Sequence, residues 1–141
     1  MKTRILSGII ILATFFTAIY RMTHSAADIV LHWDFSGDIT SYGSKNLLII
    51  LPLLSLGLTL LIAYYEKNPN KLDNPFKYKD TEFNNKAMEF YCHVITIIIT
   101  LLLLYITICS AQYFDLQPIV VILFLLLIFV LYVYTRRTLE K

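Results

Sequence analysis

Four long apolar runs without a charged residue constrain the fold of this chain more than any other feature. A transmembrane helix needs about 17–25 residues, and interfacial flanks bring the shorter runs to that length. Composition agrees, because 57% of the residues are hydrophobic and 16% are charged, compared with about 45–50% and about 25% in soluble domains. The four runs are Ile5–Tyr20, Leu47–Tyr65, Val94–Ile108 and Ile119–Tyr134.

These runs predict a single all-α integral membrane domain over residues 1–141, an antiparallel bundle of four transmembrane helices. We expect the helices at about residues 4–23, 45–65, 87–111 and 117–135, with an outer loop at 24–44 and an inner loop at 66–86. All but Arg21 and Lys45 of the 12 Lys and Arg residues lie at the chain ends or in the inner loop. Because such residues concentrate on the cytoplasmic side, both termini are predicted to be cytoplasmic.

The first segment also fits a second interpretation, a cleaved signal peptide. "MKTR" precedes an apolar run, and "HSAAD" offers small residues after it. We prefer a retained helix, because the polar residues of this segment follow an ordered helical spacing. A discarded signal has no need of that order.

Small and polar residues recur at alternating steps of three and four in the first three helices. In lipid such residues supply the close packing and hydrogen bonds between helices. The fourth segment, "IVVILFLLLIFVLY", has none, so it is predicted to lie at the periphery against lipid. The stripes are Ser7, Ile10, Thr14, Thr17, Arg21 and His24, then Pro52, Ser55, Thr59 and Ala63, and finally Glu89, His93, Thr96, Thr100, Leu103, Thr107 and Ser110.

The polar face of the third helix has two interpretations. Intramembrane ionisable residues are functional candidates, so Glu89, His93, Thr96, Thr100 and Thr107 are candidates for an ion or proton track. Alternatively, the threonines form interhelical hydrogen bonds and His93 pairs with Glu89. We favour packing, because neither ionisable group is expected near the membrane midplane. Cys92 and Cys109 lie on this same helix, about 25 Å apart, and are predicted to be buried packing residues rather than a disulfide.

The outer loop offers a candidate metal site. His24, Asp28 and His32 are spaced at four and four, so on a continued helix they would share a face, as zinc ligands do. The alternative is a solvated loop, because "DIVLHWDF" is rich in β-branched and aromatic residues.

The stretch "HWDFSGDITSYGSK" after this point predicts a turn at the membrane surface. Asp34 and Ser36 favour turns, and Gly37 can adopt positive φ. Gly43 is expected to bend the chain, and Ser44 to cap the second helix. The turn does not require His32 or Lys45, which we expect to face outward. Lys45 alternatively reaches the lipid headgroups.

"IVLHWDFSGDITSYGSK" resembles the N-terminal membrane domain, of unknown function, of SdpI-type bacterial immunity proteins, which protect against a secreted sporulation-delaying toxin. "NPFKYKDTEFNNKAMEFY" resembles the inner loop of small members of that family. The chain departs from the family in having Val30 and Leu31 where a proline often precedes the histidine. The matching positions are His32, Trp33, Asp34, Gly37, Tyr42, Gly43, Ser44 and Lys45.

The resemblance implies a non-enzymatic, multi-pass protein of the bacterial plasma membrane, acting in toxin-peptide immunity or envelope stress. Its partners would be the lipid bilayer and a peptide toxin or another membrane protein. A second hypothesis is a transporter-like or accessory subunit using the polar face of the first three helices. A metal-dependent membrane enzyme ranks third, because no nucleophile–base pair or strong metal motif is present. No cofactor is predicted, and no nucleic acid, because Glu66, Asp73, Asp80 and Glu82 interrupt the lysines of the inner loop.

Overall fold

A computed structural model describes residues 2–68 and 81–139. Four helices in this part of the chain are long and apolar enough to cross a membrane, which agrees with the four predicted spans. They are α1 (Lys2–His24), α2 (Ile50–Lys67) with the preceding 3-10 helix η1 (Lys45–Ile49), α3 (Glu82–Ser110) and α4 (Pro118–Thr138). Pro69 and Pro75, expected to keep the inner loop non-helical, lie outside the described residues.

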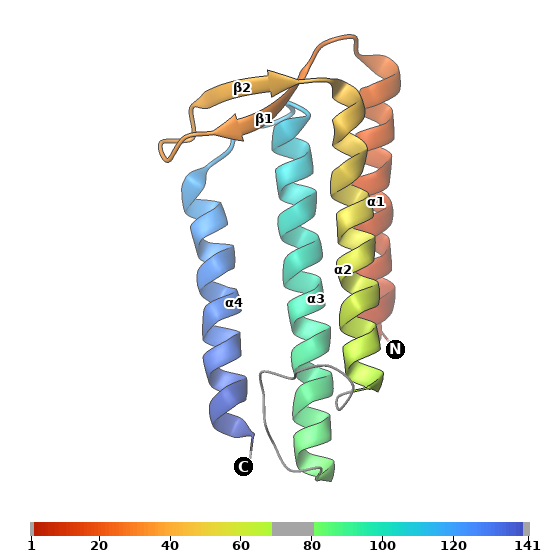
Figure 1. Ribbon diagram of the computed structural model, residues 1–141, viewed down its shortest axis with the longest axis vertical. Helices are drawn as coiled ribbons and strands as arrows, with labels where there is room; N and C mark the ends of the chain where they lie inside the picture. Colours follow the sequence, from red (N-terminus) through yellow and green to blue (C-terminus); the bar gives the residue numbers. More distant parts are fainter. Residues whose placement is uncertain (1, 69–80, 140–141) are drawn as a thin grey trace.

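The prediction of an all-α fold is wrong in the outer loop. Residues 29–43 form an antiparallel β-hairpin of β1 (Ile29–Trp33) and β2 (Ile39–Gly43). β-branched and aromatic residues favour strands. The turn between the strands lets them pair, and this pairing gives the backbone N–H and C=O groups of the loop their hydrogen-bond partners. The hairpin lies across one end of the bundle (Figure 1). We name this the hairpin end, and the opposite end, where α1 begins and α4 finishes, the terminal end.

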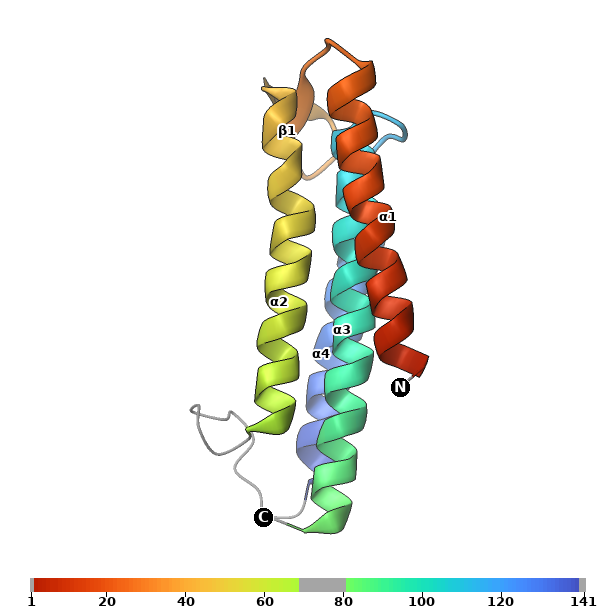
Figure 2. The same ribbon diagram turned by 90° about the vertical axis from the view of Figure 1, so that its right-hand side faces the viewer.

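α3 is the central helix of the bundle. It contacts each of the other three helices, and two perpendicular views place it between α4 and the pair α1 and α2 (Figures 1 and 2). The predicted stripes face these contacts: Ser7, Thr14, Ser55, Thr96, Thr100, Thr107 and Ser110 are all buried. α4 is the least buried of the four helices, which confirms its peripheral position. Cys92 and Cys109 are buried and unbridged, as predicted.

The threonines of the stripes do not bond between helices, contrary to the packing hypothesis. Thr100 Oγ1 donates to the carbonyl of Thr96 at 2.9 Å, and Thr107 Oγ1 donates to that of Leu103 at 2.7 Å. A hydroxyl in a helix can reach the carbonyl four residues earlier, so it needs no neighbouring helix. The stripe therefore supplies close packing and not a hydrogen-bonded seam.

Candidate functional site

The hairpin turn is built by Asp34 and Gly37. One carboxylate oxygen of Asp34 accepts the backbone N–H groups of Ser36 at 2.8 Å and Asp38 at 2.9 Å. Gly37 has φ of +91°, which residues with side chains rarely adopt. Both roles agree with the turn predicted from the sequence.

Gly37 also rests directly on the connection between α3 and α4. A Cβ at this position would lie 2.8 Å from the carbonyl oxygen of Leu116 and 3.0 Å from Cδ of Pro118. Gly43, in contrast, has no positive φ, so the need for glycine there does not come from the left-handed backbone region. It makes room for Leu31 instead, because a Cβ there would lie 2.3 Å from Leu31 Cδ1.

The base of the hairpin is anchored to the helices. Ile29 and Val30 are buried, and Ile29 packs with Ala18, Leu48 and Ala111. The hydroxyl of Ser110, at the end of α3, donates to the carbonyl of Val30. The hairpin is therefore fixed to α1, η1 and α3 at its base and to the α3–α4 connection at its turn.

Lys45 has an inward role that the sequence did not predict. Its Nζ is partly buried and donates to the carbonyl of Ser25 at 2.7 Å, just after the end of α1. Lys45 thus ties the start of η1 to the end of α1 and is not offered outward. Ser44 caps η1 as expected, its hydroxyl accepting the N–H of Asn46.

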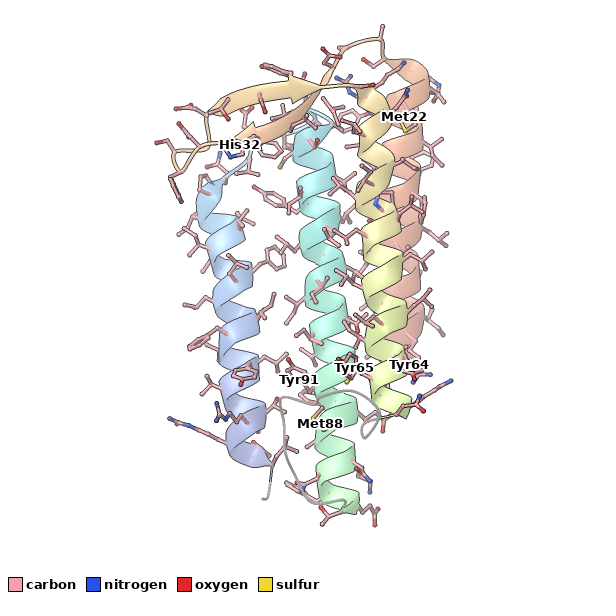
Figure 3. The ribbon with its side chains drawn as sticks, viewed as in Figure 1. Met22, His32, Tyr64, Tyr65, Met88 and Tyr91 are labelled. Carbon is pink, nitrogen blue, oxygen red and sulfur yellow. The ribbon has the colours of Figure 1, made fainter. Side chains whose placement is uncertain are left out.

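His32 lies on β1 and is exposed. Its Nδ1 lies 2.5 Å from Thr40 Oγ1, across the two strands. That hydroxyl also lies 3.2 Å from the His32 carbonyl. If its single proton goes to the carbonyl, Nδ1 carries the ring proton and Nε2 stays open as an acceptor. Figure 3 shows His32 on the hairpin above the ends of α3 and α4.

The side chains beyond the hairpin base are mostly exposed. Phe35 at the turn is fully exposed, and Leu31, Ile39 and Tyr42 are exposed along the strands. Trp33 is half-buried. The hairpin thus presents apolar and aromatic groups beside one imidazole on a rigidly held support.

The metal site proposed for the outer loop loses its geometric basis. α1 ends at His24, Asp28 lies in the connection, and His32 belongs to β1. His24 stacks on Tyr20 with 4.3 Å between ring centroids. The backbone carbonyl of Asp28 accepts hydrogen bonds from the side chains of Arg21 and Gln112. No helix carries the three residues on one face.

A second polar cluster lies near the terminal end. Glu66 on α2 is ion-paired with Arg4 on α1, and its other oxygen lies 3.8 Å from His93 Nε2 on α3. His93 therefore faces Glu66 more directly than the predicted partner Glu89, which is exposed. An adjoining cavity of about 370 Å³ is lined by residues of α1, α2 and α3, including Ser7, Thr59 and Thr96. In Figure 3, Tyr64, Tyr65 and Tyr91 mark this level of the bundle.

Arg4 and Glu66 were not among the candidate residues. A signal for them existed: residue 4 begins the first span and residue 66 follows the second apolar run, so antiparallel neighbours bring the two to the same level.

Residues 9–56 match the family model described as a domain of unknown function (DUF1648). The match covers most of α1, the whole hairpin and the first part of α2, which is less than half of the chain. The comparison with curated proteins and that with solved structures gave no significant match. The chain is thus a multi-pass, membrane-type helical protein with a DUF1648-like segment.

Proposed function

We propose that the chain is a non-enzymatic protein of the bacterial plasma membrane that recognises a secreted peptide at its hairpin, in an immunity role of the SdpI type. The observation that carries this proposal is the hairpin itself. Its base and turn are packed against the bundle, while most of its remaining side chains are exposed. A rigid support lowers the entropy lost when a partner binds.

An extended peptide is the occupant that fits this surface. A two-stranded sheet leaves an unpaired edge on each strand, and such edges bind extended segments by strand addition. All residues of β2 except Gly43 are exposed. Phe35 and Tyr42 offer the aromatic side chains that dominate many interfaces, and His32 offers a polar contact beside them.

The proposal requires the hairpin end to face outward and both termini to be cytoplasmic. The charge distribution supports this orientation, because Arg4, Lys67 and Arg136 belong to the terminal end. A reporter fused after Lys141 should read cytoplasmic, and one inserted at Ser41 should read external. An external reading at Lys141 would refute the orientation. A mature chain beginning near Asp28 would instead support the signal-peptide alternative.

A protection assay tests the recognition itself. A sensitive bacterium expressing the full chain should survive exposure to a sporulation-delaying toxin peptide. Phe35→Ala and His32→Ala should each abolish survival while leaving normal amounts of protein in the membrane. Phe129→Ala, which removes an exposed aromatic from α4, is the matched control and should protect fully. Absence of protection by the unaltered chain, or full protection by both hairpin variants, would refute the proposal.

The cavity near the terminal end favours a transporter-like or accessory subunit as a second candidate. It lies between the three helices that carry the polar stripes. Thr100 and Thr107, further along α3, are fully buried, so transport needs a conformation that opens this region. In a chain without Cys92 and Cys109, a water-soluble maleimide should label Thr59→Cys at the cavity. Transport further requires labelling of Thr100→Cys, and complete protection of that position under all conditions would exclude it.

A further inference from the structure

We propose that Glu66, Glu89 and His93 form a binding site for a divalent transition-metal cation of the Zn²⁺ type near the terminal end of the bundle. One ligand atom from each residue lies within 4.8 Å of the other two. Among the described residues this is the one such group of His, Cys, Asp and Glu side chains. It is separate from the hairpin and from the outer-loop residues considered first.

The backbone arrangement explains why these three groups converge. Glu89 and His93 are four residues apart on α3, so their side chains lie one turn apart on one face. Glu66 enters from the last turn of α2, which packs against α3. In di-iron carboxylate bundles, a Glu and a His one turn apart on one helix likewise combine with a Glu from another helix.

His93 provides a second, independent observation. Its Nε2 is buried and has no hydrogen-bond partner in the described part of the chain. The nearest carboxylate oxygen, Glu66 Oε2 at 3.8 Å, is too distant for a hydrogen bond. The side chains of His93 and Glu66 are only 16% and 13% exposed. A buried nitrogen that faces a carboxylate oxygen at this distance has room for a cation between the two atoms, which would then both act as ligands.

Charge also favours a cation at this point. Glu66 gives one oxygen to Arg4 and turns the other toward His93. Arg4 pairs with one oxygen of Glu66, so the other oxygen of Glu66 and a carboxylate oxygen of Glu89 remain beside His93 as possible ligands. Glu89 is exposed and can move to complete the site without repacking the bundle.

The ligand set points to the class of metal. Zn²⁺ accepts imidazole nitrogen and carboxylate oxygen at about 2.0–2.2 Å, and three protein ligands leave one position for water. Mg²⁺ prefers six oxygen ligands and retains its water. The adjoining cavity, which Glu66 and His93 also line, gives room for a water at the open position.

Metal binding to the purified full chain in lipid nanodiscs tests the site. The protein should carry no histidine tag, so that its 3 His residues are the only imidazoles. Titration with Zn²⁺ should show one saturable equivalent, which a tenfold excess of Mg²⁺ does not displace. Co²⁺ should bind at the same site and give the intense visible absorption of a four-coordinate ion.

Ligand variants then locate the bound ion. Glu89→Gln and His93→Gln should each weaken Zn²⁺ binding by at least about tenfold, as loss of even a supporting residue does at known sites. His24→Gln and His32→Gln are matched controls and should bind as the unaltered chain does. Because Glu89 is exposed, Glu89→Gln should keep the fold. If His93→Gln does not fold, the Zn²⁺ affinity of Glu89→Gln alone decides whether the site exists.

Three results would overturn the proposal. They are absence of saturable Zn²⁺ binding, unchanged affinity in Glu89→Gln, and loss of binding in His24→Gln or His32→Gln. The last would move the ion to the hairpin end. None of these results bears on the protection assay, so failure of the metal site and failure of peptide recognition are distinguishable.

Discussion

Lys45→Met should lower the free energy of unfolding by about 1–2 kcal/mol. A hydrogen bond from a charged donor contributes about 1.5–3 kcal/mol, and partial exposure reduces that figure. The cation also lies just after α1, where the negative end of the helix dipole adds about 0.3–1 kcal/mol at surface positions. Methionine keeps most of the aliphatic stem, so the loss isolates the contact from Nζ to the Ser25 carbonyl at 2.7 Å.

Unfolding of the detergent-solubilised protein by increasing SDS, followed by far-UV circular dichroism, measures this change. Lys86→Met is the matched control, because the Lys86–Glu82 ion pair is exposed and lies within one helix. Such pairs contribute about 0.3–0.5 kcal/mol. Equal losses in the two variants would show that Lys45 is no more than a solvated surface charge, and the structural role argued for it would be wrong.

Gly37→Val should cost at least about 1–2 kcal/mol from positive φ alone, with a further loss because its Cβ meets the backbone of Leu116. Thermal melting of the purified protein measures this loss of stability. Gly57→Ala is the control and should be neutral or stabilising, since nothing lies near a Cβ at that site. Thr100→Leu should destabilise by about 1–3 kcal/mol through overpacking, more than Leu126→Ala, which faces outward from α4. The reverse order in the same melting assay would contradict the assignment of helix faces.

The spans were predictable because charge-free runs leave the chain few alternatives in lipid. Their ends were less so. The third helix begins at Glu82 rather than near residue 87, because Thr81 caps it by accepting the N–H of Asn84. Polar residues in the first turn of a helix cannot be distinguished from a loop by hydropathy alone. Glu66 was assigned to the inner loop for the same reason, although it belongs to the last turn of α2.

The hairpin was the larger omission. The turn at Asp34 and Gly37 was recognised, and the β-branched residues around it argued against a helix. Strand pairing is local, between residues 29–33 and 39–43, and β-branched residues on both sides of a turn could have indicated it. The attachment of the hairpin to the bundle could not be predicted, because Ser110 is 80 residues away from Val30 in the sequence. Contacts at that separation leave no local pattern. The inward direction of Lys45 was not predicted either, because its partner is a backbone carbonyl, which any residue could supply.

The attachment of the hairpin has a consequence for biogenesis. With the hairpin end facing outward, as proposed above, a chain that inserts from its N-terminus exports residues 29–43 after its first crossing, before α3 and α4 have been synthesised. Ala111 and Ser110, which cover the base of the hairpin, arrive with the third crossing. Leu116 and Pro118, on which its turn rests, arrive only when the fourth begins. In the proposed orientation, the outer loop is therefore among the first segments delivered across the membrane and among the last to reach its final packing.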